Sequence, residues 1–129
     1  MEYMTKTHSK FLLQYHFIFV VKYRKNIIGK YPIKEIFQQL QENRNFVIET
    51  MEVDKDHIHL LVRTEPKISP LQIVRKLKQE STVRLWKEFS KELKKDFWKE
   101  RTFWSDGYFV STIGNVSEET LRRYIEEQG

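Results

Sequence analysis

Two histidines separated by a single residue are the first pair in this sequence with the chemistry of a metal site. His57-Ile58-His59 opens an apolar run, 57–64, that predicts a short strand. Side chains alternate along a strand, so we expect both imidazoles on one face and Ile58 on the other. Imidazole is the commonest metal ligand in proteins, and two on one face can hold a divalent ion. From these three residues alone, a pair of half-exposed histidines without a ligand is an equally good interpretation.

A tyrosine near the end of the chain has the chemistry of a nucleophile. Tyr124 and Gln128 are four residues apart, so they are neighbours on one face of a helix. A tyrosine hydroxyl forms covalent intermediates, but its ordinary pKa is about 10, so it needs help from a metal ion or a polarised phosphate. The amide oxygen of Gln128 can serve as a third metal ligand. With Leu121 and Ile125, the same residues also describe an ordinary amphipathic helix that packs Tyr124 in a core.

The first element that can position these residues is a strand over residues 11–23. Its odd positions are almost all apolar and its even positions are mixed, which predicts one core face and one partly polar face. A helix follows, marked by Pro32 near its start and by apolar residues at helical spacing. Its apolar residues are Ile33, Ile36, Phe37 and Leu40. Two further strands, 46–53 and 57–64, are joined by the polar turn Asp54-Lys55-Asp56 and predict a β-hairpin.

The second half of the chain predicts a long helix, a strand and a last helix. Ser69-Pro70 has the form of an N-cap followed by the first helical residue. One side of this helix carries Val74, Leu77, Ser81 and Leu85, and residues 87–101 continue or follow it. A strand is expected over 108–113, ended by Gly114-Asn115. The last helix starts at Ser117 with acidic residues in its first turn and ends beside Gly129, where we expect it to fray.

This order, β-α-β-β-α-β and then an extra helix, predicts an α+β fold of the ferredoxin-like, split β-α-β type. Residues 1–129 form one domain with a four-stranded antiparallel sheet and two helices on one face. The first and third strands lie side by side in the middle of the sheet. The other face is left for function, together with the C-terminal helix that bears the tyrosine.

Composition narrows the class of protein. The chain has 23 Lys and Arg against 18 Asp and Glu, a net charge of +5, and no cysteine. The positive excess suits a polyanionic partner, although many proteins without such a partner are as basic. The absence of cysteine excludes disulfides and thiolate metal sites and favours a reducing compartment. With no signal-peptide pattern and no membrane-length apolar run, we expect a cytoplasmic protein.

Taken together, the motifs resemble those of the single-tyrosine transposases of the HUH superfamily, the IS200-like transposases of small insertion sequences. The resemblance runs nearly end to end, and its core is Asp56-His57-Ile58-His59-Leu60 in this order with Tyr124-Ile125-Glu126-Glu127-Gln128. It also includes His8-Ser9-Lys10-Phe11, Tyr15-His16, Lys22-Tyr23-Arg24, Trp104-Ser105-Asp106-Gly107-Tyr108-Phe109 and Gly114-Asn115-Val116. A His-x-His pattern is weak alone, but this combination is highly specific.

The resemblance implies a homodimer with an Mg²⁺ or Mn²⁺ site built from His57, His59 and Gln128. It implies that Tyr124 attacks a DNA phosphate at the element's end, leaving a 5′-phosphotyrosine link and a free 3′-OH. It further implies recognition of hairpins in single-stranded DNA at the element ends. We therefore expect a metal-dependent transposase that cleaves and rejoins single-stranded DNA.

Several other residues can support this function. His16 can support a metal ligand or contact DNA, and support or packing is preferred here over direct ligation of the metal. Basic residues in two clusters can contact phosphates, although an ordinary solvated face is the more frequent explanation for such clusters. They are Lys22, Arg24 and Lys25 after the first strand, and Arg75, Lys76, Lys78 and Arg84 on the long helix. The tryptophans, Trp86, Trp98 and Trp104, can stack on unpaired bases or belong to the core.

Other functions remain open from sequence. Sheets of this topology also occur in non-catalytic modules that bind single-stranded nucleic acid through exposed aromatic residues. A domesticated, repeat-associated tyrosine nuclease would have the same site without mobility. A metal-dependent hydrolase is a third possibility, but it requires a water-activating group that the sequence does not offer.

Overall fold

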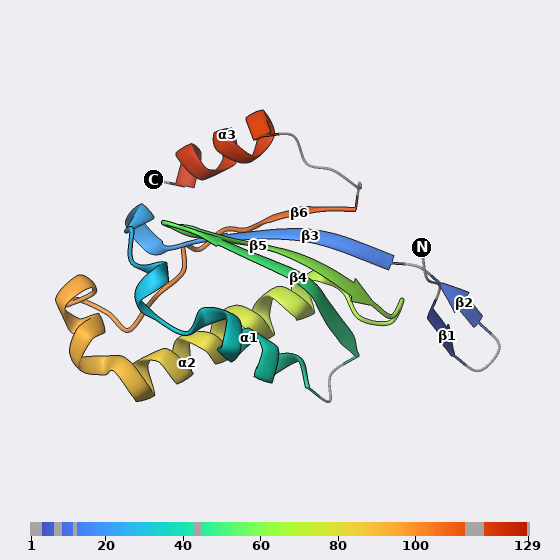
Figure 1. The fold of residues 1–129 in the computed structure, drawn as a ribbon, viewed down its shortest axis with the longest axis horizontal. Coiled ribbons are helices and arrows are strands. Elements are labelled where there is room, and N and C mark those ends of the chain that lie inside the picture. The colour runs from blue at the N-terminus through green and yellow to red at the C-terminus, as the bar shows by residue number, and fades with distance from the viewer. Residues whose placement is uncertain (1–3, 7–8, 12, 43–44, 113–117, 129) are drawn as a thin grey trace.

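A computed structural model of the chain describes residues 4–6, 9–11, 13–42, 45–112 and 118–128. Its centre is a four-stranded antiparallel sheet in the order β4-β5-β3-β6, with α1 and α2 on one face and α3 on the other (Figure 1). The strands are β3 (Leu13–Val20), β4 (Phe46–Asp54), β5 (His57–Thr64) and β6 (Phe109–Ser111); the helices are α1 (Ile33–Gln41), α2 (Pro70–Asp96) and α3 (Glu118–Gln128). The predicted ferredoxin-like α+β fold is confirmed, with β3 and β5, the predicted first and third strands, in the middle.

The ends of several elements differ from the predicted ones. A small hairpin of β1 (Met4–Lys6) and β2 (Ser9–Phe11) precedes the sheet, so β3 begins at Leu13 rather than at Phe11. The same strand stops at Val20, because the 3₁₀ turn η1 (Lys22–Arg24) follows and places Tyr23 and Arg24 at φ 62° and 52°, which no strand accommodates. Helix α2 does continue past residue 87, but it ends at Asp96. The predicted break at Gly114-Asn115 and the helix start at Ser117 lie outside the described residues.

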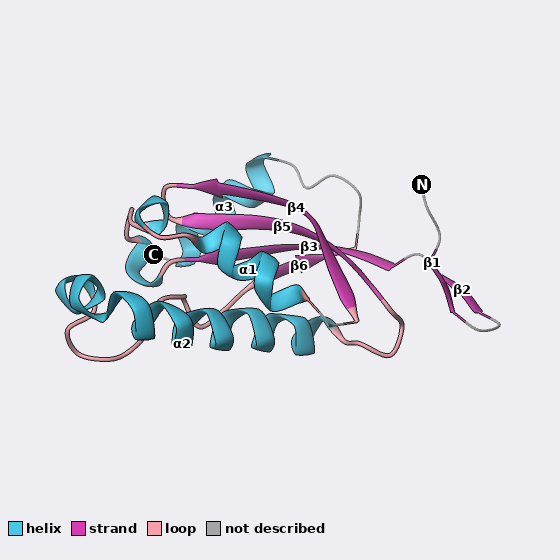
Figure 2. Cartoon of the chain, turned by 60° about the horizontal axis from the view of Figure 1, so that its bottom comes forward, coloured by secondary structure: helices cyan, strands magenta, loops and turns pink. Residues whose placement is uncertain are grey.

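The face of the sheet under α1 and α2 carries the main core. Ile58, Leu60 and Val62 of β5 are fully buried and alternate with half-buried residues, as expected for a strand with one core face. Helix α2 begins as predicted, with Pro70 as its first residue. The Ser69 hydroxyl accepts a hydrogen bond from the backbone N–H of Gln72. Figure 2 shows α1 and α2 packed side by side across this face. The predicted inner side of α2, including Ser81, is buried.

The opposite face of the sheet is covered by α3. Ile18 and Val20 of β3 form a small buried cluster with Ile125 of α3, and the rings of Phe109 and Tyr124 pack against it. Because β3 is buried on both faces, residues 17–21 are a continuous apolar run rather than an alternating one. The tyrosine helix therefore lies on the face of the sheet that α1 and α2 leave open.

Two of the three tryptophans belong to the core. The indole N–H of Trp86 donates to the Thr102 carbonyl at 2.8 Å, and that of Trp104 donates to the Ser81 hydroxyl at 3.0 Å. Both rings are almost completely buried, so neither can stack on a nucleic-acid base. Trp98 is different, with 75% of its surface exposed. In the described part of the chain, no helix is long and apolar enough to span a membrane.

Candidate functional site

His57 and His59 lie on the α3 side of the sheet, as strand alternation predicts. Both are half-buried, while Ile58 between them faces the main core. In the pairing of β5 with β3, His57 is opposite Val20 and His59 is opposite Ile18. Directly opposed residues of an antiparallel pair share a face. The two imidazoles therefore border the apolar cluster on which α3 rests.

The ring of His57 is held by a carboxylate. Its Nδ1 lies 3.0 Å from Oδ1 of Asp56, and because an ionised carboxylate only accepts, Nδ1 is the protonated nitrogen. Asp56 is held in turn by Arg24, whose Nε donates to Oδ2 at 3.4 Å. This contact leaves Nε2 of His57 with a free lone pair, which is the arrangement found in metal-bound histidines. From sequence, Asp56 belongs to the predicted turn and the motif, and its place next to His57 is the signal that could have indicated this contact.

The ring of His59 is held by a second histidine. Nδ1 of His16 lies 3.0 Å from Nε2 of His59, and the two rings stack with centroids 5.1 Å apart. One of these two nitrogens donates and the other accepts; when Nε2 of His59 is the donor, its Nδ1 keeps a free lone pair. Burial, and then the neighbouring His16, lower the pKa of His59. The neutral ring, which is the form that binds metals, is thereby favoured.

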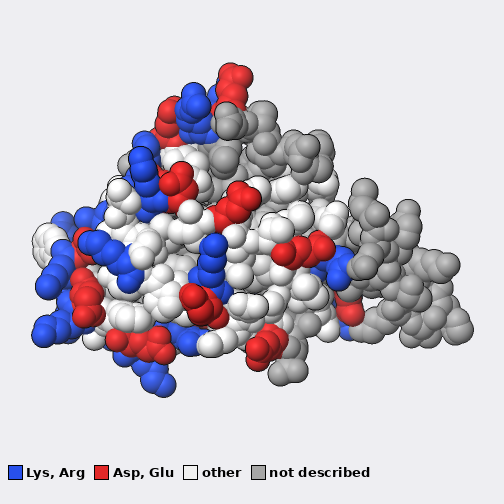
Figure 3. Space-filling view, in the orientation of Figure 1, with Lys and Arg blue, Asp and Glu red and all other residues white. Residues whose placement is uncertain are grey.

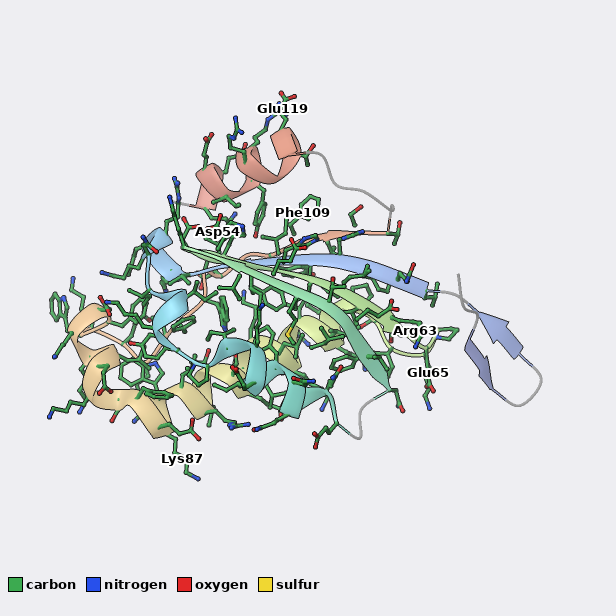
Figure 4. The ribbon with its side chains drawn as sticks, viewed as in Figure 1. Asp54, Arg63, Glu65, Lys87, Phe109 and Glu119 are labelled. Carbon is green, nitrogen blue, oxygen red and sulfur yellow. The ribbon has the colours of Figure 1, made fainter. Side chains whose placement is uncertain are left out.

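Tyr124 lies on α3, and its side chain is half-buried against the open face. Its ring packs on Phe109 of β6 with centroids 5.7 Å apart, and Figure 4 places Phe109 between the sheet and α3. Its hydroxyl is buried and has no hydrogen-bond partner among the described residues. Burial raises the pKa of Tyr124 to about 12. Since most buried hydroxyls are hydrogen-bonded, an unpartnered one calls for an explanation other than packing.

Gln128 lies one turn after Tyr124 on α3, as predicted. Its amide touches Gly107: a Cβ at that position would lie 3.2 Å from Oε1 and 3.7 Å from Nε2 of Gln128. Helix α3 also contacts η1, the turn that follows β3. The absence of a side chain at Gly107 thus leaves the space that the Gln128 amide uses.

Lys78 has a structural role that the sequence analysis did not foresee. Its ammonium donates to the carbonyls of Ser105, Asp106 and Gly107, at 2.6, 3.2 and 3.0 Å. An ammonium has three donors, so none remains for a phosphate. Lys78 thus holds the 105–107 segment, against which Gln128 lies, and its role in DNA binding stays a prediction.

The remaining basic residues of the two predicted clusters differ in the contacts that their side chains make within the protein. Lys22 is paired with Glu100 at 2.8 Å, a hydrogen bond that raises the pKa of Lys22. Lys25 lies over the ring of Phe97, and Arg84 donates to Gln39 at 2.6 Å. Arg75 is exposed at the rim of a groove of about 670 Å³ along α2. These contacts neither require nor exclude binding to phosphates.

The donors on the open face suit a divalent ion. One nitrogen of each imidazole is engaged by a neighbour, and Nε2 of His57 keeps a free lone pair. Within the described ranges, no group of three or more His, Cys, Asp and Glu side chains could hold a metal, so an ion held by the two histidines would need a third ligand of another type. An amide oxygen such as that of Gln128 meets this need for a hard ion such as Mg²⁺ or Mn²⁺.

Almost the whole chain is similar to known transposases. The family described as "Transposase IS200 like" matches residues 9–128. The transposase for insertion sequence element IS200 of Salmonella typhimurium is 32% identical over 124 residues, which cover 94% of this chain and 80% of the relative. The ISDra2 transposase TnpA of Deinococcus radiodurans is 30% identical over 119 residues, which cover 90% of this chain and 84% of the relative.

Solved structures show the same fold. A crystal structure of a candidate transposase from Deinococcus radiodurans superposes with a TM-score of 0.84 at 27% identity, covering 97% of this chain and 98% of the other. A REP-associated tyrosine transposase bound to a REP hairpin is more distant, with a TM-score of 0.56 at 13% identity over 95% of this chain and 69% of the other. The second likeness is one of fold alone.

Proposed function

This chain belongs to the family of IS200-like transposases, and from that membership we propose that it cleaves and rejoins single-stranded DNA with Tyr124 as the nucleophile. The observation that carries the proposal is the Tyr124 hydroxyl. It is buried without a hydrogen-bond partner in the described structure, on the same sheet face as His57 and His59. A packing role does not require the hydroxyl, whereas a nucleophile does.

The reaction is a transesterification. Tyr124 Oη attacks the scissile phosphorus and forms a new O–P bond, while the bond from phosphorus to the 3′ oxygen of the preceding nucleotide breaks. Oη loses its proton, and the 3′ oxygen takes one up to become a 3′-OH. The 5′ phosphate remains on the tyrosine, so the energy of the phosphodiester bond is kept for rejoining. No water nucleophile is needed for this step.

The protein must overcome the poor acidity of this tyrosine. With a pKa of about 12, on the order of one molecule in 10⁵ carries the phenolate at pH 7. His57, His59 and Gln128 would hold an Mg²⁺ or Mn²⁺ ion, with Asp56 and His16 orienting the two imidazoles. When bound, such an ion acts as a Lewis acid on the phosphate and orients it for attack.

The DNA partner we propose is a hairpin in single-stranded DNA at the ends of the element. The distant structural neighbour is bound to a REP hairpin, which makes this class of partner the natural first choice. We also propose a homodimer. In the described sheet β6 pairs with β3 on one side only, and its Val110 is 37% exposed, so this edge is open to a second chain.

The direct test is to trap the covalent intermediate. The protein is incubated with labelled single strands from the element's ends and Mn²⁺, and denatured samples are examined for a protein–DNA adduct. We expect an adduct that disappears with EDTA. A folded protein that binds these strands but forms no adduct with any of them would refute the nucleophilic role of Tyr124.

A further inference from the structure

The positive charge of this chain is concentrated in two segments that meet at one end of the molecule. Residues 22–30 contain four Lys and Arg and no acidic residue, and residues 91–101 contain five against three. Their combined net charge of +6 exceeds the +5 of the whole chain, so the remainder is slightly acidic. The two segments are joined by the ion pair of Lys22 with Glu100 and by the contact of Lys25 with Phe97. Figure 3 shows Lys and Arg gathered at the end of the molecule where α2 stops.

Two large aromatic side chains are exposed among these charges. Trp98 is 75% exposed and Tyr23 is 61% exposed, and both line a pocket of about 250 Å³ between the two segments. A lysine ammonium lies by each ring: Lys99 is 4.9 Å from the centroid of Trp98, and Lys22 is 5.8 Å from that of Tyr23. Aromatic rings among cations are the composition that binds unpaired bases and their phosphates.

The backbone that presents Tyr23 is in an unfavourable conformation. Tyr23 and Arg24 have φ values of 62° and 52°, and the left-handed region is disfavoured for residues with a side chain. The tyrosine ring gains no burial in return, since most of it faces solvent. A strained and exposed aromatic residue does not stabilise the fold, which is typical of a residue that serves in binding.

This surface is connected to the candidate site. Arg24, next to Tyr23, holds Asp56, and Asp56 holds the ring of His57. The same turn, η1, contacts α3, which carries Tyr124 and Gln128. The η1 turn is thus linked by direct contacts both to the His57 ring and to α3.

We propose that the surface formed by residues 22–30 and 91–101 binds the single-stranded DNA next to the scissile phosphate, with Tyr23 and Trp98 stacking on unpaired bases. The proposal rests on the proposed function, because it takes the strand in the site to be DNA. It is distinct from that function in its residues: neither aromatic side chain belongs to the group that carries the chemistry. The bases stack through their faces, so binding at this surface does not depend on their sequence.

The test measures the affinity for a labelled oligothymidylate strand by fluorescence anisotropy, alongside the adduct assay with element ends. Stacking of a base on an aromatic side chain contributes to the binding affinity, so Trp98→Ala is expected to raise Kd by about tenfold. Tyr23→Gly is expected to do the same without lowering the Tm, because glycine accepts the left-handed backbone. Val83→Ala, which changes a side chain of α2 that is 67% exposed, is the matched control and should bind as the wild type does. Val83→Ala should also form the adduct as the wild type does.

The outcomes separate the two proposals. If both aromatic variants bind oligothymidylate as tightly as the wild type, the stacking surface is refuted whether or not an adduct forms. Tighter binding of the duplex than of the single strand would refute it as well. If the wild type forms no adduct but its binding depends on Trp98, the nucleophilic role of Tyr124 fails and the surface stands.

Discussion

Replacing Tyr124 by Phe removes one oxygen atom and tests the central residue of the site in two ways. The hydroxyl is buried and has no hydrogen-bond partner in the described structure. On folding it therefore loses its hydrogen bonds to water, and no hydrogen bond within the protein offsets that cost in free energy. A buried unpaired polar group costs about 1–3 kcal/mol, and the lower end applies because the residue is only half-buried. We therefore expect Tyr124→Phe to raise the free energy of unfolding by about 1 kcal/mol. For a domain of this size, that corresponds to a rise in Tm of roughly 3–5 °C.

The same substitution is expected to abolish the covalent adduct completely, because the attacking oxygen is gone. Thermal unfolding and the adduct assay on one preparation give both quantities. Tyr31→Phe is the matched control: it changes another buried tyrosine, packed against Phe89 and Phe103 on the other face, and should form the adduct normally. A loss of stability in Tyr124→Phe would mean that the hydroxyl has a partner. An adduct formed by Tyr124→Phe would show that another residue is the nucleophile.

Four further predictions concern the residues around the tyrosine. His57→Ala or His59→Ala should remove binding of Mn²⁺, measured by calorimetry, while circular dichroism stays unchanged; undiminished binding in both would refute the metal site. Asp56→Asn should weaken Mn²⁺ binding by about tenfold, since a neutral amide oxygen holds the His57 N–H less firmly than a carboxylate does; an affinity equal to that of the wild type would show that the contact is incidental. Gly107→Ala places a methyl group 3.2 Å from the Gln128 amide, so adduct formation should fall with little change in Tm. The lowered pKa of His59 means that the unfolded chain binds this proton more readily, so metal-free protein should lose stability as pH falls below about 6.5, and His59→Gln should reduce that loss.

The fold was predictable because local patterns agreed with each other. Alternation along residues 57–64, the Ser69-Pro70 cap and the inner side of α2 each indicated the element that is observed. The pairing of His16 with His59 was not predictable in detail, because it depends on the register between β3 and β5 across 43 residues. Periodicity determines which face a side chain is on, but not which residue it meets there.

The role of Lys78 shows a second limit of sequence reasoning. A lysine on an amphipathic helix is expected to face solvent, and its neighbours Arg75 and Lys76 do. Lys78 instead meets three carbonyls from a segment 27–29 residues further along the chain. Nothing in local composition indicates such a contact, since backbone carbonyls are present in every segment. Local composition likewise does not indicate that Trp98 is exposed whereas the other two tryptophans belong to the core.

The two faces of the sheet differ greatly in how much apolar surface covers them. Of the described residues, twenty-three form the core beneath α1 and α2, whereas three form the cluster beneath α3, and only Ile125 of these belongs to the helix. Burying one such side chain contributes roughly 1.5–3 kcal/mol, against about 5–15 kcal/mol for unfolding a whole domain. We therefore expect α3 to separate from the sheet more readily than the domain unfolds. Such undocking would move Tyr124, so a binding partner that prefers either state would shift its position.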